Sequence, residues 1–227
     1  MILITGASKG IGKYLFDRFC KNGELVYGTY YNTKPASSNI GNYEKVNVCN
    51  INEVENWINS LKENLHSIVL INCAGSNYNS LAHKSDPESW YNVIKTNLLG
   101  TYNVIRVVLP KMREDNYGRI INFSSVVAQI GTPGASAYAA SKSGLWGLSK
   151  CIAAENASKG ITINNLNLGY FGLGMINEVP IEFQNTLKTK IPTGDFGDTK
   201  NIYNAVLFLI QSEYVNGTSI DINGGLI

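Results

Sequence analysis

Tyr138 and Lys142 are the two residues of this sequence whose types and spacing point most directly to chemistry. If Tyr138 opens a helix, the four-residue spacing places the phenol and the ammonium group on one helix face. A cation at that position lowers the pKa of the phenol. A phenol tuned in this way is a proton donor suited to carbonyl chemistry.

The spacing alone does not single out this pair, because Tyr30 with Lys34 and Tyr91 with Lys95 repeat it. A tyrosine followed one helical turn later by a lysine is usually an amphipathic surface pair. At most one of the three pairs is expected to be catalytic, and the surrounding sequence decides which.

A glycine-rich stretch at residues 5–12 forms a second candidate site. It stands between an apolar run at the start of the chain and a stretch with helical spacing. Gly6, Gly10 and Gly12 allow the backbone to turn tightly and to approach a pyrophosphate, whose charge is met by the N-terminus of the following helix. The pattern predicts a nucleotide-binding loop, with a flexible turn between strand and helix as the alternative.

Short runs rich in β-branched and aromatic residues alternate with helical stretches along the whole chain. The pattern predicts strands at residues 1–4, 25–30, 43–48, 67–72, 118–124, 161–168 and 218–222. It predicts helices at residues 10–21, 51–64, 86–115, 137–158 and 199–211. Such alternation implies right-handed crossovers and a parallel sheet of about seven strands with helices on both faces. We therefore expect an α/β fold with a Rossmann-type doubly wound sheet, forming a single domain over residues 1–227.

The segment 170–198 interrupts this alternation, because it holds four glycines and two prolines around a short helical stretch near residues 181–190. A long insert in a compact domain is usually a lid or a binding loop. We expect this segment to be the mobile part of the site and to act as a substrate lid.

Composition and charge exclude several classes of protein. Of the 227 residues 44% are hydrophobic, and the formal net charge is +2, which is too even a balance for a general nucleic-acid or membrane surface. No apolar run approaches the roughly 20 residues that span a bilayer. The first four residues are typical of a strand start and not of a signal peptide. A cytoplasmic location is expected.

The cysteines and histidines indicate neither disulfides nor a metal site. The cysteines are widely spaced, lie in or beside apolar segments, and form no Cys-x-x-Cys pair, so reduced, buried thiols are expected at Cys20, Cys49, Cys73 and Cys151. The two histidines have no partner at ligand spacing, and no metal is predicted.

The spacing T-G-x-x-x-G-x-G of residues 5–12 resembles the cofactor loop of the short-chain dehydrogenase/reductases, in their single-domain branch of about this length. Further matches follow in the family's order along nearly the whole chain. They are Asn72-Cys73-Ala74-Gly75 for N-x-A-G, Asn97 for the mid-helix asparagine, Ser125 for the serine thirteen residues before the tyrosine, Tyr138 with Lys142 for Y-x-x-x-K, and Asn223-Gly224-Gly225 for the glycine-rich ending.

The resemblance selects Tyr138 and Lys142, since the other two pairs lack the upstream serine and the correct strand. It implies that Tyr138 gives its proton to a carbonyl oxygen while NAD(P)H delivers a hydride to the carbonyl carbon. Lys142 would bind the nicotinamide ribose and hold the pKa of the phenol down. Ser125 would hydrogen-bond the carbonyl oxygen, and Asn97 would hold a water that relays protons to Lys142. Ser124 is the weaker serine candidate, because neighbouring strand residues point to opposite faces.

NADP(H) is the predicted cofactor, in preference to NAD(H). The end of the second strand, residues 29–34, has no carboxylate to bind the ribose hydroxyls and repel a 2′-phosphate. Lys9 occupies the loop position where NADP-using members of the family often carry a basic residue. Asn47 stands where many relatives place an aspartate near the adenine, and an amide can accept and donate there. The residues expected to contact the cofactor are Gly6, Ser8, Lys9, Gly10, Ile11, Gly12, Tyr31, Asn32, Asn47, Val48, Asn72, Ala74, Gly75, Tyr138, Lys142, Gly169 and Phe171.

Two positions depart from the family pattern. Leu168-Gly169 replaces the usual Pro-Gly after the sixth strand, and Leu173 replaces the threonine that follows four residues after that glycine. The backbone at Phe171 can still contact the nicotinamide carboxamide, but the threonine's hydroxyl contact is missing. A looser nicotinamide or a different lid closure is implied.

Residues 191–197 and the preceding segment resemble the lid of 3-oxoacyl-acyl-carrier-protein reductases and their near relatives. The leading hypothesis is therefore NADPH-dependent reduction of a ketone to a secondary alcohol, with a 3-oxoacyl or polyketide-like substrate. The alternatives are a dehydrogenase/reductase of a sugar or other small polar alcohol, and a non-catalytic nucleotide-binding or scaffold protein. An acyl carrier protein is a candidate partner, and the resemblance implies a homodimer or homotetramer formed through the helices at 86–115 and 137–158.

Overall fold

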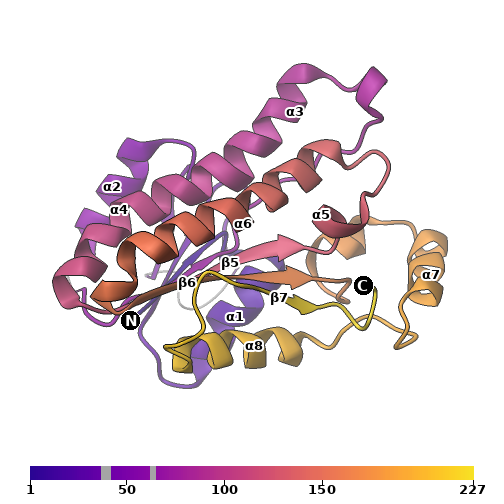
Figure 1. Ribbon diagram of the computed structural model, residues 1–227. Coiled ribbons are helices and arrows are strands. Elements are labelled where there is room, and N and C mark those ends of the chain that lie inside the picture. Colours follow the sequence, from indigo (N-terminus) through magenta and orange to yellow (C-terminus); the bar gives the residue numbers. More distant parts are fainter. Residues whose placement is uncertain (37–41, 62–64) are drawn as a thin grey trace.

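One parallel sheet organises the structure, a computed structural model that describes residues 1–36, 42–61 and 65–227. Its strands lie in the order β3-β2-β1-β4-β5-β6-β7, and all neighbouring pairs are parallel. The strands are β1 (Ile2–Thr5), β2 (Val26–Tyr30), β3 (Tyr43–Lys45), β4 (Val69–Asn72), β5 (Gly118–Ser125), β6 (Ile161–Leu168) and β7 (Ser219–Ile222). Helices cover both faces of the sheet (Figure 1), so the predicted doubly wound fold is confirmed.

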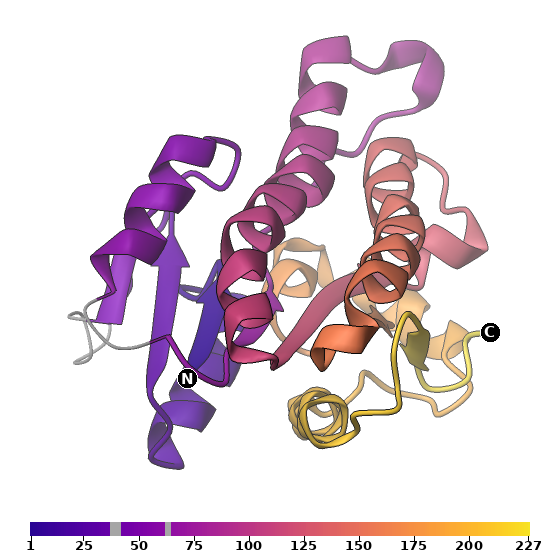
Figure 2. The same ribbon diagram turned by 60° about the vertical axis from the view of Figure 1, so that its left-hand side comes forward.

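The helices form two layers, and each layer has its own hydrophobic core. Side chains of α2, α4 and α6 pack on one face, and those of α1 and α8 pack on the other (Figures 1 and 2). In β1 the side chains alternate between the two cores, with Ile2 and Ile4 against α1 and Leu3 against α2 and α4. The helices are α1 (Gly10–Lys21), α2 (Ile51–Ser60), α3 (Pro87–Ile94), α4 (Gly100–Asp115), α5 (Val127–Ile130), α6 (Ser136–Asn156), α7 (Ile181–Lys190) and α8 (Thr199–Gln211).

Capping residues explain why several helices begin where the sequence predicts. The side chain of Asn50 accepts a hydrogen bond from the backbone of Asn52 at the start of α2. Asp86 caps α3 in the same way and is followed by Pro87 in the first turn, while Asp198 caps α8. Each cap satisfies a backbone N–H group that the helix itself leaves without a partner.

The helix predicted at residues 86–115 is present over residues 87–115, but it is not regular in its middle. A π-helical turn, η3 (Lys95–Leu99), joins α3 to α4. A π turn adds one residue to a helix without removing its apolar periodicity, so spacing alone does not reveal it. The helix predicted at 51–64 ends at Ser60, and the residues at its expected end lie outside the described part of the chain.

Several short elements were not predicted from the sequence. They are the helix α5 directly after β5, and the 3₁₀ turns η2 (Ala82–Lys84) and η5 (Gly174–Glu178), whereas the 3₁₀ turn η4 (Ala157–Lys159) forms the end of the helix predicted at 137–158. The predicted strand at 43–48 ends early, at Lys45, because Asn47 turns the chain with its own side chain, which accepts a hydrogen bond from Cys49 N. Elements of one turn carry too few residues for a periodic pattern.

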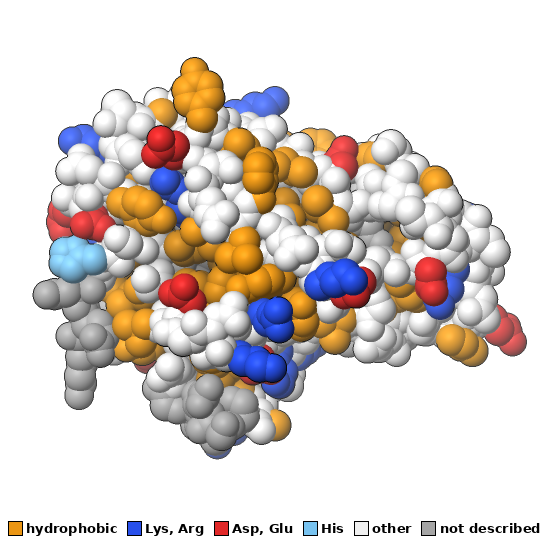
Figure 3. Space-filling view, turned by 90° about the horizontal axis from the view of Figure 1, so that it is seen from below, with side chains coloured by type: hydrophobic (Ala, Val, Ile, Leu, Met, Phe, Trp, Pro, Cys, Tyr) orange, Lys and Arg blue, Asp and Glu red, His pale blue; other side chains and the backbone are white. Residues whose placement is uncertain are grey.

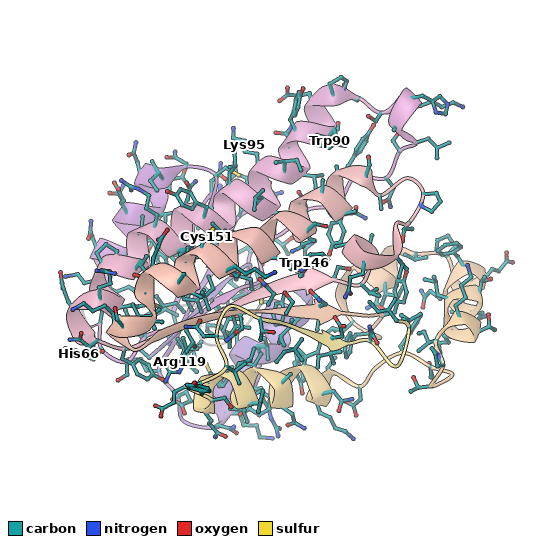
Figure 4. The ribbon with its side chains drawn as sticks, in the orientation of Figure 1. His66, Trp90, Lys95, Arg119, Trp146 and Cys151 are labelled. Atoms are coloured by element: carbon teal, nitrogen blue, oxygen red, sulfur yellow. The ribbon has the colours of Figure 1, made fainter. Side chains whose placement is uncertain are left out.

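The prediction of four buried cysteines is wrong for Cys151, which is exposed on α6, whereas the other three are partly buried and all four are free thiols (Figure 4). No helix in residues 1–36, 42–61 or 65–227 has the length and apolar character to cross a membrane. On the face formed by α1 and α8, basic and acidic side chains both occur around a group of apolar ones (Figure 3).

Replacing Trp57 by alanine should lower the free energy of unfolding by about 3–5 kcal/mol. The indole of Trp57 lies in the core between α2, α4 and the sheet and is 1% exposed, so its removal leaves a cavity that the sheet cannot close. Urea denaturation followed by circular dichroism measures this change. Asn56→Ala, at an exposed position of the same helix, is the matched control and should change the free energy of unfolding by less than about 0.5 kcal/mol. Equal losses in both variants would contradict the assigned core.

Candidate active site

The residues that the sequence singles out meet along one edge of the sheet. Gly6 follows β1, Asn72 ends β4, Ser125 ends β5 and Gly169 follows β6. These are the carboxyl ends of neighbouring parallel strands. The strand order changes direction at β1, which has β2 on one side and β4 on the other, and ligands of open parallel sheets bind in the crevice at such a point.

The loop between β1 and α1 has no room for side chains at two of its glycines. Gly6 has a φ of +63°, and a Cβ atom there would lie 2.7 Å from the Cα atom of Ala74. A Cβ atom on Gly12 would lie 2.3 Å from the carbonyl oxygen of Gly6. Both glycines are therefore required by close packing of backbone on backbone, between this loop and the segment after β4 and within the loop itself.

This loop and the residues around it fit a dinucleotide. The side chain of Lys9, the residue before α1, makes no capping hydrogen bond to this helix, so the N–H groups of its first turn can meet a pyrophosphate. Beside the loop, Asn72 is 4% exposed, and its Oδ1 atom has no hydrogen-bond partner among the residues that the structure describes. A buried acceptor of this kind is what a ligand or an ordered water satisfies.

Thr5, to which the sequence analysis gave no contact, ties this loop to the loop after β4. Its Oγ1 atom accepts hydrogen bonds from Cys73 N at 3.2 Å and from Ala74 N at 3.1 Å. The two glycine-containing motifs are thus one unit. Thr5 stands at the first position of the glycine-rich motif, which is the signal that could have identified it.

The residues expected at the adenosine end lie after β2 and β3. Tyr31 and Asn32 are exposed, Val48 is buried, and the Oδ1 atom of Asn47 accepts from Cys49 N. Lys45 also lies here, although no sequence motif marks it, and its ammonium nitrogen is 5.8 Å from the centroid of the Tyr31 ring. Pairing of β3 with β2 produces this neighbourhood, and single-sequence spacing does not reveal which strands pair.

Tyr138 and Lys142 lie in the first two turns of α6, as the sequence predicted. The Nζ atom of Lys142 is 5.6 Å from the centroid of the Tyr138 ring and donates a hydrogen bond to the carbonyl oxygen of Phe123 at 2.7 Å. Lys142 is 7% exposed, and burial lowers its pKa to about 8. Its charge is therefore held between an aromatic ring and a carbonyl dipole.

The expected lowering of the Tyr138 pKa by Lys142 is not found. Burial raises the pKa of the Tyr138 phenol to about 12, and a hydrogen bond with the side chain of Ser125 opposes this rise. Burial disfavours the charged phenolate more strongly than the hydrogen bond with Ser125 favours it. The phenol is consequently protonated at neutral pH, which is the form that donates a proton.

Asn97 lies in the π-helical turn and is fully buried. Its Oδ1 atom accepts from Ser76 N at 2.8 Å, and its Nδ2 group donates to Ser76 O at 2.9 Å and to Ser141 Oγ at 3.0 Å. Ser141 donates in turn to the carbonyl oxygen of Tyr138. The asparagine therefore connects the loop after β4 with the helical turn that carries the tyrosine.

Gly75 separates Asn97 from Lys142. A Cβ atom at Gly75 would lie 3.3 Å from Asn97 Oδ1 and 3.9 Å from Lys142 Nζ. The glycine keeps the space between the amide oxygen and the ammonium group open. A site that is polar on both sides in this way suits a bridging water.

Ser124 and Ser125 have different surroundings. Ser125, 8% exposed, accepts from Val127 N at 3.2 Å, and its side chain lies near enough to the Tyr138 hydroxyl to lower the pKa of that phenol. Ser124 donates instead to the carbonyl oxygen of Lys142 at 3.1 Å and accepts from the indole of Trp146. Ser125 is therefore the serine that reaches the phenol.

The segment 170–198 begins and ends beside this edge of the sheet. Phe171 forms an isolated parallel bridge with Gly197, and Gly197 N donates to Tyr170 O at 2.9 Å. Between these ends, η5 lies against α1, next to the glycine loop. A cavity of about 740 Å³ lies behind the segment, among α8, β7 and residues 191–198, and its lining includes neither Tyr138 nor Lys142.

The two competing Tyr and Lys pairs lie away from this cluster. Tyr30 is in β2 and not in a helix, so its spacing to Lys34 has no helical meaning. Tyr91 is 62% exposed on α3, and Lys95 is exposed at the start of the π turn (Figure 4). Within the described parts of the chain, no group of three or more metal-ligating side chains occurs.

Comparisons with known proteins show which family the chain resembles. The sequence profile of the family described as short chain dehydrogenase matches residues 1–182. The chain is 33% identical over 233 residues to the 3-oxoacyl-[acyl-carrier-protein] reductase FabG of Haemophilus influenzae, covering 99% of this chain and 96% of that protein. It is 34% identical over 237 residues to the protein of the same name from Staphylococcus aureus strain Mu50, with coverage of 99% and 96%.

A solved structure is similar over almost the whole fold. The crystal structure of 3-oxoacyl-[acyl-carrier protein] reductase from Brucella melitensis superposes with a TM-score of 0.91 at 26% sequence identity. The match covers 99% of this chain and 90% of that one.

Replacing Lys142 by methionine should change how stability depends on pH. Between pH 8 and pH 10 the unfolded parent chain holds a proton on Lys142 that the folded protein has released, because the folded pKa is about 8 and the ordinary value is 10.5. The parent's free energy of unfolding should therefore rise with pH relative to that of Lys142→Met. Urea denaturation at half-unit intervals measures the difference, and exposed Lys95→Met controls for the loss of one positive charge. A parent-minus-variant difference that stays flat over this window would contradict the buried ammonium.

Proposed function

Because the chain belongs to the short-chain dehydrogenase family and is an NAD(P)-dependent oxidoreductase, we propose that it reduces a ketone to a secondary alcohol with NADPH. The observation that carries the proposal is the contact of Ser125 with the Tyr138 hydroxyl, next to the buried ammonium of Lys142. Two donors that converge beside a buried cation are suited to a carbonyl oxygen on which negative charge develops.

In the proposed reaction, Ser125 and Tyr138 both donate hydrogen bonds to the carbonyl oxygen of the substrate. When bound, the reduced nicotinamide supplies the hydride. Tyr138 transfers its proton to the oxygen as negative charge accumulates there. The ammonium of Lys142 then stabilises the phenolate that remains, because it lies 5.6 Å from the ring centroid. This stabilisation compensates for the burial that disfavours the phenolate otherwise.

We assign the return of a proton to the Tyr138 phenolate to Lys142 and to a water held by Asn97, in the space that Gly75 leaves open. Asn97 Oδ1 is fixed by Ser76 N, and the missing side chain of Gly75 leaves space between this oxygen and Lys142 Nζ. A water in that space would accept from the lysine and donate to the amide oxygen. A lysine whose pKa is about 8 can exchange protons with such a water near neutral pH.

We assign cofactor contacts to the residues named from the sequence and add Thr5 and Lys45. The glycine loop would hold the pyrophosphate, Asn72, Ala74 and Gly75 would line its far side, and Phe171 would meet the carboxamide through its backbone. For NADP(H), the 2′-phosphate would find Lys9, which is exposed at the start of α1, or Lys45 beside Tyr31. A compact ammonium is a common phosphate partner.

The proposed substrate is a 3-oxoacyl chain. The support is the name that the two bacterial relatives carry, together with their coverage of 99% of this chain. The segment 170–198 is proposed as the lid, and its helix α7 offers an apolar surface, with Ile181 66% and Phe183 54% exposed. An acyl chain is the kind of ligand that such a surface would cover.

The same proposal covers the organisation and partners of the protein. Residues 1–227 are proposed to form one NAD(P)-binding domain, which works in the cytoplasm as a homodimer or homotetramer. The proposed contact between subunits is made by α6 and by α3 and α4, which continue one another through the π turn and run beside α6 in Figures 1 and 2. An acyl carrier protein is the proposed macromolecular partner, as the names of the relatives suggest.

Purified protein should oxidise NADPH in the presence of a 3-oxoacyl thioester such as acetoacetyl-coenzyme A, measured by the loss of nicotinamide absorbance. Tyr138→Phe should lower kcat by about 10²- to 10⁴-fold, because the proton donor is removed while the ring remains. The affinity for NADPH, measured by fluorescence titration, should stay within about twofold. Turnover of free polyols alone would replace the 3-oxoacyl reading by a polyol dehydrogenase, and full activity of the variant would remove Tyr138 as the acid.

NADPH should support a kcat/KM about tenfold or more above that of NADH, since a charged phosphate contact contributes about 1.5–3 kcal/mol. Lys9→Ala should narrow this ratio by raising the KM for NADPH without changing that for NADH. Lys13→Ala, one turn further along α1, is the matched control because its partner is Asp17 of the same helix. Equal use of both cofactors by the parent enzyme would overturn the preference.

A further inference from the structure

Trp146 connects α6 to the ends of two strands at once. It lies one helical turn after Lys142, and its indole points from α6 toward the sheet (Figure 4). The indole N–H donates to Ser124 Oγ at 3.1 Å and to Asn167 Oδ1 at 3.0 Å. Ser124 is the neighbour of Ser125 at the end of β5, and Asn167 lies opposite Ser124 in β6. The indole N–H of Trp146 is therefore hydrogen-bonded to the ends of two neighbouring strands, β5 and β6.

The contact with Ser124 closes a small ring around Lys142. Ser124 Oγ accepts from the indole and donates its own proton to the carbonyl oxygen of Lys142 at 3.1 Å. In a helix the same carbonyl oxygen accepts from the backbone N–H of the residue four positions later, which is Trp146. Side chain and backbone of Trp146 thus fix the turn of α6 that carries the lysine.

The contact with Asn167 extends the network to the segment after Ser125. Asn167, which is 2% exposed, donates through Nδ2 to Asp221 Oδ1 of β7 at 2.8 Å. The same carboxylate oxygen accepts from Gln129 Nε2 of α5 at 3.0 Å. Near the end of β5, one chain of hydrogen bonds therefore links α6 to β6, β6 to β7, and β7 to α5.

Hydrogen bonds matter for the position of α6 because most of the buried side chains near the start of this helix are small. In its first four turns the buried residues of α6 are Ala137, Ser141, Lys142, Leu145 and Ser149. Small side chains leave few interlocking ridges, and apolar burial has no preferred direction. A helix packed in this way is placed along its axis chiefly by hydrogen bonds, which weaken steeply when their angles change.

Reduction of a ketone by the proposed route requires an accurate placement of α6 on β5. Ser125 belongs to β5 and Tyr138 belongs to α6, yet both must reach one carbonyl oxygen. A displacement of about 1 Å between reacting groups costs on the order of 10²-fold in rate. The contacts that hold the helix against the strand therefore act on the chemical step.

We propose that Trp146 is a positioning residue, which sets the distance between Ser125 and Tyr138 through its hydrogen bonds to Ser124 and Asn167. This inference rests on the proposed reductase function. Trp146 touches neither substrate nor cofactor in this scheme. Its effect is exerted through the serine next to Ser125 and through the carbonyl oxygen of Lys142.

Trp146→Phe tests the proposal, because it removes the indole N–H and keeps an aromatic ring. With the 3-oxoacyl thioester and NADPH, kcat should fall about tenfold or more, whereas the KM and Kd for NADPH should stay within about twofold. Trp57→Phe is the matched control, since it makes the same replacement in the core under α2, away from Tyr138. A kcat within twofold of the parent, or an equal loss in Trp57→Phe at equal folded fraction, would overturn the proposal.

A double-mutant cycle with Ser124→Ala separates a specific contact from general loosening. If the indole acts through Ser124, each single variant should lose kcat and the double variant should lose little more than the larger single loss. Effects that multiply in the double variant would show that the two residues act independently. That result would contradict the proposed path from Trp146 to Ser125.

Crystal structures of the parent and of Trp146→Phe give a measurement that does not depend on the substrate. The distance between Ser125 Oγ and Tyr138 Oη should increase in the variant, and α6 should move along its axis. An unchanged distance would overturn the positioning role even if activity were lost. If the parent protein reduces none of the ketones tested, the proposed function fails, while this distance still decides the role of Trp146.

Discussion

The buried ammonium group of Lys142 sets the conditions for everything around it. A charge removed from water needs partners of defined geometry, and the nearest is the carbonyl oxygen of Phe123 at 2.7 Å. That contact ties α6 to β5 at the turn next to Tyr138. A side chain at Gly75 would press on the amide oxygen of Asn97, at 3.3 Å, and would touch the ammonium group at 3.9 Å. This one buried charge therefore has Tyr138, Asn97 and the loop after β4 as its neighbours.

The polar character of this region extends along the underside of α6. Asn122 in β5 donates to Ser149 of α6, and its Oδ1 atom accepts from Asn72. Ser149 donates to Asn165 of β6 at 2.9 Å, and all four of these polar residues are buried between α6 and the sheet. Buried networks of this kind permit few alternative packings, since any shift leaves a polar group without a partner. They fix the helix more strictly than apolar side chains would.

The sequence predicted the architecture because its signals are local and repeated. Seven strands and the main helices follow from alternation and helical periodicity, and the candidate site follows from family motifs that lie at strand ends and in the two long helices. The π turn at Asn97 was missed because one additional residue does not disturb the apolar spacing. The pKa of Tyr138 was misjudged because desolvation depends on the packing of the whole fold. The role of Trp146 depends on which strands are neighbours, and that information is absent from linear spacing.

The bridge between Phe171 and Gly197 has a consequence for chain entropy. The fold already joins the two ends of the intervening segment. The entropy lost in closing this loop is therefore already part of the free energy of folding. Rearrangement of α7 within this loop does not need to separate β6 from its neighbours. Such a rearrangement would change only the local order of this segment, while the strands that carry Ser125 and Leu168 keep their register.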